Sequence, residues 1–208
     1  ITFFLMPSVS LSSFLLSTDI LLVLFWTGGL VQLLNIKNNP SSINFILLGV
    51  ILGFAFLSKY AAVYFIISLI IFLIIEKNFR IIFFQSKLNL LLSCIMLLLV
   101  LSPNIIWNYN HAWLTFDHTV ENASLNNMKL NLDGLVIFLL SQIIMIGPIL
   151  FVVFLYYIKK NIKISINEKF LISFSLPTLI IVSIESILVR AHANWAAVSL
   201  GSLLGLCV

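Results

Sequence analysis

Long apolar runs alternate with short polar clusters along this chain. A helix that crosses a hydrocarbon core of about 30 Å needs about 20 apolar residues, so each bounded run predicts one membrane span. Seven segments result from this rule, at residues 20–36, 43–57, 61–75, 88–106, 135–158, 170–189 and from 196 onwards. Residues 1–6 are expected to end an earlier span, and the Gly147-Pro148 pair is expected to break the span that contains it.

The apolar run at residues 43–75 needs more than one crossing. As one helix its 33 residues would be about 50 Å long, and Ser58, Lys59 and Tyr60 interrupt it. We therefore predict a helical hairpin with Lys59 at its tip. Because each arm has only about 15 residues, the tip should stop at or slightly below the outer membrane interface. An ammonium group at that depth needs an anionic partner or a water-filled cavity.

The composition excludes a soluble protein. Hydrophobic residues make up 62% of the 208 residues, charged residues make up 9%, and the mean hydropathy is +1.18. The chain is therefore expected to be an all-α, polytopic transmembrane helical bundle. No repeat of fixed period divides it, so we treat residues 1–208 as one membrane domain. Because the chain begins at Ile1 rather than Met and ends at Val208 inside an apolar run, we expect truncation at both ends.

The distribution of cations predicts which loops share a side of the membrane. The formal net charge of +4 does not imply a nucleic-acid partner, because the placement of Lys and Arg matters more than their sum in a membrane chain. If alternate loops lie on opposite sides, eight cations (Lys37, Lys77, Arg80, Lys87, Lys159, Lys160, Lys163 and Lys169) face three (Lys59, Lys129 and Arg190). The positive-inside rule makes the side with eight cytoplasmic. Asp19, the hairpin tip, the loop at residues 107–134 and residues 190–195 then share the outer face.

Asp19 and Lys59 each have a structural and a functional interpretation. Asp19 lies at the start of an apolar run, where a carboxylate can cap the helix that follows. The alternative is that Asp19 binds a metal or acts as an acid or base. Lys59 is the only charge in the predicted hairpin. Its side chain either extends along the apolar surface to reach water or contacts a phosphate group in the membrane.

The loop at residues 107–134 combines aromatic, amide, histidine and carboxylate side chains, as sugar and head-group pockets do. Trp107, His111 and Trp113 are its candidates for substrate contacts, and an interfacial aromatic belt is the alternative. Four side chains could in principle hold a metal, namely His111, Asp117, His118 and Glu121. Their spacing matches no dedicated zinc pattern, so we predict no metal site here and leave a divalent metal cofactor open.

The sequence RAHANW, at residues 190–195, gathers polar side chains between two apolar segments. The planar guanidinium group of Arg190 matches phosphate geometry, although Arg and Trp also anchor helices at the membrane interface. His192, Asn194 and Trp195 are further candidates for substrate binding. An intrahelical pair with Arg190 suffices to explain Glu185 in the preceding span.

Several stretches together resemble one family. They are STDILLVLFW (17–26), GFAFLSKYAAVYF (53–65), SPNIIWNYNHAWLTF (102–116), SQIIMIGPILF (141–151) and HANWAAVSL (192–200). In the same order, they are similar to stretches of the bacterial dolichyl-phosphate-mannose-protein mannosyltransferase-like proteins of the GT-C superfamily. That group includes the lipid A aminoarabinose transferases and the RgtA/B/C/D-like enzymes. The resemblance covers nearly the whole chain.

The resemblance implies an inverting glycosyltransferase of the bacterial inner membrane. It implies transfer of a sugar from a polyprenyl-phosphate donor to lipid A, a glycan or a protein on the periplasmic face. Asp19 matches the family's acidic residue near the donor site, and Lys59 matches the lysine of its L-T/S-K element, which contacts the donor phosphate. His192, Asn194 and Trp195 match its H-x-N-W element. The family's catalytic carboxylate lies in the first outer loop, so we expect the catalytic residue upstream of Ile1.

The chemistry of such a transfer agrees with these residues. A polyprenyl phosphate leaves with negative charge, so the enzyme needs a cation near it, Lys59 or Arg190 here, and a carboxylate base to activate the acceptor hydroxyl. The rival hypothesis is a transporter or lipid flippase, which would show repeats with broken helices in corresponding places. A structural membrane subunit is a third hypothesis. It predicts that Lys59→Ala and Arg190→Ala leave sugar transfer unchanged.

Overall fold

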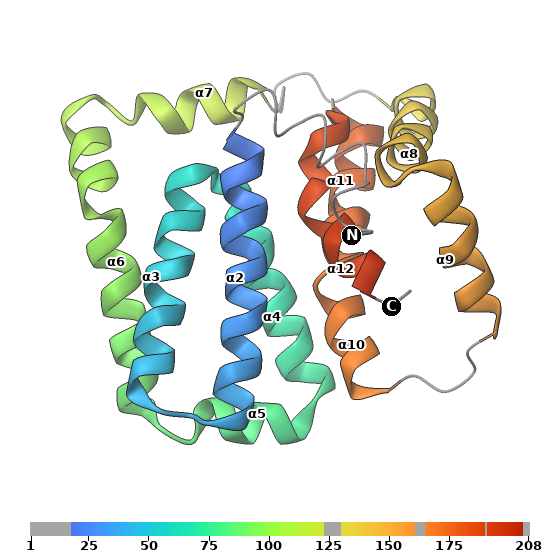
Figure 1. Ribbon diagram of the computed structural model, residues 1–208. Helices are drawn as coiled ribbons and strands as arrows, with labels where there is room; N and C mark the ends of the chain where they lie inside the picture. The colour runs from blue at the N-terminus through green and yellow to red at the C-terminus, as the bar shows by residue number, and fades with distance from the viewer. Residues whose placement is uncertain (1–17, 123–129, 161–164, 190, 206–208) are drawn as a thin grey trace. The chain divides into compact units, whose positions relative to one another are not determined.

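The computed structural model describes residues 18–122, 130–160, 165–189 and 191–205, and every regular element in these ranges is helical (Figure 1). This confirms the predicted all-α class. The chain divides into two compact units. The N-terminal unit is Thr18–Asn110, and the C-terminal unit begins at His111. Residues 1–6, which we expected to end an earlier span, lie outside the described ranges.

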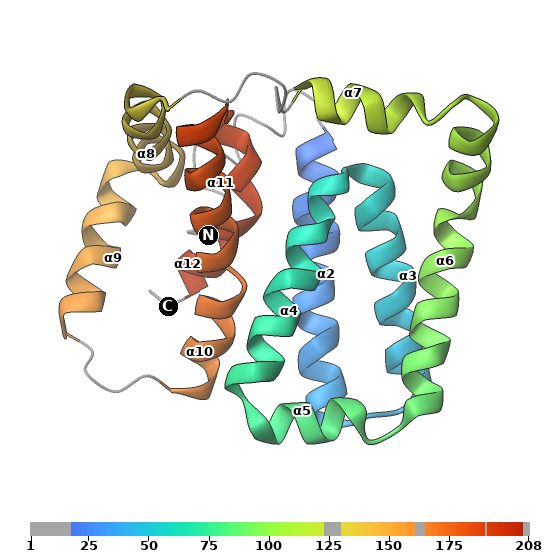
Figure 2. The same ribbon diagram turned by 180° about the vertical axis from the view of Figure 1, so that it is seen from behind.

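The N-terminal unit contains four long helices and two short ones. Its elements are α2 (Thr18–Asn38), α3 (Ser42–Ser58), η1 (Tyr60–Ala62), α4 (Val63–Ile75), α5 (Lys77–Phe84) and α6 (Lys87–Asn110). Figures 1 and 2 show α2, α3, α4 and α6 side by side, with α5 across one end. The end of the unit at α5 is called the α5 end below, and the end that holds Lys59 is called the Lys59 end.

Aromatic packing joins α2 to α4 in the core of this unit. The rings of Trp26 and Phe65 are both fully buried and meet edge to face, with 5.1 Å between their centroids. Gly29 makes room for this contact, because a Cβ atom there would lie 2.8 Å from Cζ of Phe65. Burial of such rings is a large part of what holds the two helices together.

Two glycines allow α3 and α6 to pack closely. Gly49 and Gly53 are four residues apart, so they lie on the same face of α3. A Cβ atom on Gly49 would lie 2.1 Å from the backbone oxygen of Ser93, and one on Gly53 would lie 2.6 Å from Cβ of Val100. This is the small-xxx-small arrangement by which membrane helices bring their backbones together.

Helix α6 continues through Pro103 without losing its hydrogen bonding. A proline has no N–H to donate to the carbonyl four residues earlier, which here belongs to Leu99. The hydroxyl group of Ser102 donates to that carbonyl oxygen over 2.7 Å instead. The last two turns of α6 therefore remain helical and carry Asn104 and Asn108 to the Lys59 end.

The predicted hairpin at residues 43–75 is confirmed. Helix α3 ends at Ser58, Lys59 is extended (φ −164°, ψ 138°), and η1 leads directly into α4. The polar stretch that follows α4 was predicted as a loop, but Lys77–Phe84 form α5, bent by 114° from the preceding helix. Phe79 and Phe83 bury one side of this short helix, which is why it forms.

The C-terminal unit contains α7 (Leu114–Asn122), α8 (Leu132–Ile146), α9 (Pro148–Lys160), α10 (Ile166–Ser173), α11 (Leu176–Leu188), η3 (Ala193–Ala196) and α12 (Ala197–Gly205). The segment predicted at residues 135–158 is two helices, and the expected break lies at Gly147-Pro148. Gly147 has φ 92°, a conformation that favours glycine, and Pro148 starts the next helix. Ile146, Leu200 and Leu203 form a buried cluster in this unit.

Three helical stretches in the described ranges are long and apolar enough to cross a membrane. They are Thr18–Asn38, Lys87–Asn110 and Ile166–Leu188, and a fourth results if the bent pair Tyr60–Ile75 and Lys77–Phe84 counts as one span. Ser42–Ser58 and Leu132–Ile146 are apolar but shorter. The predicted segments are therefore helical, but fewer than seven satisfy the length of a full crossing. Many large apolar side chains are exposed, Leu98 and Ile137 among them, as a lipid-facing surface requires.

Candidate functional site

An ion pair lies at the tip of the hairpin. Nζ of Lys59 lies 2.6 Å from Oδ1 of Asp19, and the two side chains are 27% and 14% exposed. Lys59 stands between α3 and η1, and Asp19 is in the first turn of α2, 40 residues away in sequence. We predicted an anionic partner or a water-filled cavity for Lys59, and the structure shows an anionic partner, Asp19. The side chain of Lys59 therefore keeps partial access to its surroundings beside the pair.

Two sources of positive charge lie next to Asp19. The amino-terminal end of α2 carries the positive end of the helix dipole, which favours a carboxylate in the first turn. Lys59 adds a full positive charge on the other side of the same carboxylate. The helix end and the pair with Lys59 thus both stabilise a carboxylate group at this position.

Both backbone groups of Lys59, its N–H and its carbonyl, form hydrogen bonds. The N–H of Lys59 donates to the carbonyl of Ala55 over 3.0 Å, which ends α3. The carbonyl of Lys59 accepts from the N–H of Ala62 over 3.0 Å, which starts η1. The extended residue is therefore a fixed corner between two helical elements and gives its side chain a defined origin.

A network of amide and hydroxyl groups ties the next residue to α6. The hydroxyl group of Tyr60 donates to Oδ1 of Asn104 over 2.9 Å. Nδ2 of Asn108 donates to the Asn104 backbone oxygen at 2.9 Å, to Oδ1 of Asn104 at 3.2 Å and to the Tyr60 hydroxyl at 3.4 Å. Asn108 is only 1% exposed. We call Tyr60, Asn104 and Asn108 the polar clamp.

Sequence analysis did not identify Asn104 and Asn108 as site residues. Their spacing of four places them on one face of α6, and that face is turned towards η1. Two amides on one face near the end of an apolar helix were the available signal. Their partner Tyr60 is 44 residues away from Asn104, and sequence spacing does not reveal such a contact.

The H-x-N-W element forms a single turn in the C-terminal unit. It contains η3, in which the N–H of Trp195 donates to the carbonyl of His192 over 3.0 Å and their rings lie 5.5 Å apart. Nε2 of the buried Gln142, on α8, donates to the carbonyl of Ala193 over 3.0 Å. His192 and Asn194 are exposed and Trp195 is half-buried. Gln142, which was not predicted as a site residue, thus fixes a turn that exposes His192 and Asn194.

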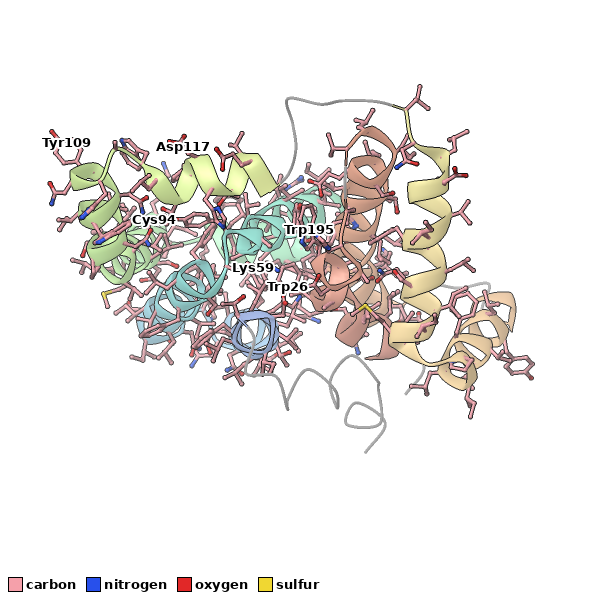
Figure 3. All side chains as sticks on the ribbon, turned by 90° about the horizontal axis from the view of Figure 1, so that it is seen from above. Trp26, Lys59, Cys94, Tyr109, Asp117 and Trp195 are labelled. Carbon is pink, nitrogen blue, oxygen red and sulfur yellow. The ribbon has the colours of Figure 1, made fainter. Side chains whose placement is uncertain are left out.

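The other predicted substrate residues are divided between the units. Trp107 is on α6 in the N-terminal unit, whereas His111 and Trp113 are at the start of the C-terminal unit, and both tryptophans are exposed. Ala112 and Trp113 adopt positive φ angles of 51° and 61°, and the Trp113 ring packs edge to face on Phe116. Positive φ is strained for a bulky residue, which marks this turn as structurally constrained. Figure 3 labels Trp195 in the C-terminal unit and Lys59 in the N-terminal unit.

Two further predictions concern Arg190 and a metal. Arg190 lies outside the described residues, so its role stays a prediction. Within the described ranges, no three His, Cys, Asp or Glu side chains gather in a way that could hold a metal ion. The candidate site described here therefore consists of the Asp19–Lys59 pair with the polar clamp beside it, and separately the turn at residues 192–195.

Comparison with known proteins places this arrangement in a family. The sequence model of the family described as dolichyl-phosphate-mannose-protein mannosyltransferase matches residues 2–107. The lipid A galacturonosyltransferase RgtD of Rhizobium johnstonii is 28% identical over 197 residues, which cover 94% of this chain and 41% of that relative. The chain thus spans less than half the length of this curated relative. No solved structure matches. With half of its residues matched, and with the Asp19–Lys59 pair inside the matched region, the chain belongs to the dolichyl-phosphate-mannose-protein mannosyltransferase family.

Proposed function

We propose that the protein of which this chain is part transfers a sugar from a polyprenyl-phosphate donor to an acceptor of the bacterial envelope. The Asp19–Lys59 pair is the observation that carries the proposal, because it holds an ammonium group at the end of an apolar hairpin. A lipid-linked phosphate presents its charge at that depth. Membership of a glycosyltransferase family favours this function over the transporter hypothesis.

Lys59 acts on the phosphate of the donor. As the bond between sugar and phosphate breaks, negative charge builds up on the departing phosphate, and a cation already in position stabilises that charge. In the absence of donor, Asp19 neutralises Lys59, which lowers the cost of keeping an ammonium group near hydrocarbon. With donor bound, the ammonium group has hydrogens for both anions, since a lysine carries three donors.

The acceptor hydroxyl requires a base that these residues do not supply. The carboxylate of Asp19 is already engaged in the 2.6 Å pair with Lys59. We assign the base to a carboxylate upstream of Ile1, as the family resemblance implies. Arg190 is the candidate for a second cation at the donor phosphate.

The acceptor side is supported by the relative and by the exposed turn. The relative from Rhizobium johnstonii is a lipid A galacturonosyltransferase, which supports lipid A as the acceptor here, with glycan or protein as alternatives. His192, Asn194 and Trp195 offer the ring faces and amide groups that sugars bind, and Trp107, His111 and Trp113 are further substrate contacts. We place the reaction at the periplasmic face of the inner membrane, in line with the positive-inside rule.

A transfer assay with the full-length protein tests the function. The assay supplies a polyprenyl-phosphate sugar and lipid A, with and without a metal chelator, and compares Lys59→Ala with Lys129→Ala. Lys129 is a matched control because it belongs to the same predicted outer side. We expect Lys59→Ala to lower kcat/KM for the donor on the order of 100-fold, as loss of one preorganised electrostatic contact does, and Lys129→Ala to change it less than about twofold. Equal effects of the two substitutions would contradict the role of Lys59, and absence of transfer by the wild type with every lipid-linked sugar would contradict the function.

A further inference from the structure

The α5 end of the N-terminal unit has a built surface of its own. Helix α5 is bent by 114° from the α4 segment and lies across the end of the bundle (Figure 2). Helix α3 runs from the α5 end to the Lys59 end and has 17 residues. At the rise of an α-helix it is about 25 Å long, so the two ends are about that far apart. The surface is therefore distinct from the proposed donor site.

Helix α5 is held on the bundle by one of its two faces. Phe79 and Phe83 are buried, and their rings lie 5.1 Å from Phe72 of α4 and 5.5 Å from Phe45 of α3, respectively. These contacts keep α5 in a fixed orientation. Its opposite face exposes Ile81 and Phe84 by 58% and 53%. A short helix with exposed apolar side chains across the end of a membrane bundle is typical of an interfacial helix.

Four cations belong to α5 and to the ends of the helices that meet it. Lys77 and Arg80 are exposed on α5, Lys87 is exposed at the first residue of α6, and Lys37 is half-buried in the last turn of α2. The ion pair found among the described residues lies at the other end of the unit, so none of these four cations is paired with a described carboxylate. Glu76, the carboxylate that precedes α5, is buried, so the charged side chains that this end exposes on α5 are Lys77 and Arg80.

We propose that this surface, formed by Lys37, Lys77, Arg80 and Lys87 around Ile81 and Phe84, binds the head groups of anionic phospholipids. The guanidinium group of Arg80 and the flanking ammonium groups match phosphate oxygens in charge and geometry. Ile81 and Phe84 lie at the boundary between head groups and acyl chains, where exposed apolar side chains of an interfacial helix are stable. Clusters of Lys and Arg next to membrane spans attract anionic lipids in this way. The proposal does not depend on the function assigned to the Lys59 end.

Lipid binding to the purified full-length protein tests this proposal. Native mass spectrometry compares retention of phosphatidylglycerol and phosphatidylcholine with identical acyl chains, for the wild type and for Lys77→Gln/Arg80→Gln/Lys87→Gln. We expect the wild type to prefer phosphatidylglycerol. In the triple variant, the ratio of retained phosphatidylglycerol to retained phosphatidylcholine should fall on the order of tenfold. High salt should weaken the preference of the wild type, since exposed charges are screened.

A charge-preserving variant controls for disturbance of the fold. Lys77→Arg/Arg80→Lys/Lys87→Arg keeps three cations at the same positions, so it should retain the preference of the wild type. The single substitutions Lys77→Gln and Arg80→Gln alter only exposed side chains and should each remove part of it. Equal binding of the two lipids by the wild type, or an unchanged preference in the triple glutamine variant, would overturn the proposal.

Discussion

The hydroxyl group of Tyr60 donates a hydrogen bond to Oδ1 of Asn104 over 2.9 Å. Tyr60 directly follows Lys59, the lysine that we assign to the donor phosphate. This contact fixes the corner between α3 and η1 against the last turns of α6. The ammonium group of Lys59 can act as a preorganised charge only if that corner does not move. The polar clamp therefore gives the proposed site its rigidity.

Tyr60→Phe tests the clamp with the smallest possible change. It removes one hydroxyl group, while Oδ1 of Asn104 keeps the donor from Asn108, so we expect a cost of about 0.5–1.5 kcal/mol in stability. We expect kcat/KM for the donor to fall about tenfold, less than in Lys59→Ala, because the cation is still present but less well placed. Steady-state kinetics with Tyr64→Phe as control provide the measurement. An unchanged kcat/KM in Tyr60→Phe would show that the corner does not need the clamp.

Asp19→Asn leaves the ammonium group of Lys59 without its counter-ion. Both side chains are mostly buried, and removal of one partner from a buried pair costs several kcal/mol. Because Lys59 keeps some access to water, we expect a smaller loss of about 2 kcal/mol in the free energy of unfolding. Denaturant or thermal unfolding in detergent measures it.

The exchange Asp19→Lys/Lys59→Asp separates the structural role of the pair from its chemical role. Opposite charges then face each other again, so the double variant should recover stability relative to Asp19→Lys alone. It should not recover transfer, because the cation no longer lies at the tip of the hairpin. A double variant as active as the wild type would mean that only the pair matters and that Lys59 does not contact the phosphate.

Close packing of α3 on α6 makes a further prediction. Gly49→Ala places a methyl group 2.1 Å from the backbone oxygen of Ser93, so the helices must separate, at a cost of about 1–3 kcal/mol or more. Gly28→Ala is the matched control, because its Cβ would lie 3.6 Å from Cγ2 of Ile51, an ordinary contact. Alanine is also the better helix former, so Gly28→Ala should be neutral or slightly stabilising. Thermal unfolding of the two variants that gives the same midpoint would contradict the packing described here.

Gln142→Leu tests the support of the turn at residues 192–195. The substitution removes the donor to the carbonyl of Ala193, and loss of such a hydrogen bond costs about 0.5–1.5 kcal/mol. Ser183→Ala is the control, because that hydroxyl only donates to the carbonyl of Leu179 in its own helix. We expect the unfolding midpoint and the transfer rate to fall in Gln142→Leu and to stay close to wild type in Ser183→Ala. The interpretation of Gln142 fails if both variants behave alike.

Charge and hydropathy were sufficient to predict part of this fold. The length of the apolar run and its interruption at Ser58, Lys59 and Tyr60 predicted the hairpin. The cost of a charge in hydrocarbon predicted an anionic partner or a water-filled cavity for Lys59. The break at Gly147-Pro148 follows from local backbone chemistry and was also predicted. These features depend on the residues themselves or on their immediate neighbours.

The remaining features depend on contacts between residues distant in sequence. Three contacts join different helices: the pair of Asp19 with Lys59, the approach of Gly49 to α6, and the hydrogen bond of Tyr60 to Asn104. Helix α5 was missed for the same reason. Its eight residues are too few to form a stable helix alone, and burial of Phe79 and Phe83 against other helices stabilises it.

Binding of polyprenyl phosphate without a sugar tests the central claim most directly, because it isolates the phosphate contact from the chemistry of transfer. The measurement is the Kd of this lipid for the full-length wild type, Lys59→Ala and Lys59→Arg. We predict that Lys59→Ala weakens binding about tenfold or more and that Lys59→Arg, which keeps the charge, retains most of the affinity. The same Kd for the wild type and Lys59→Ala would contradict the assignment of Lys59 to the donor phosphate.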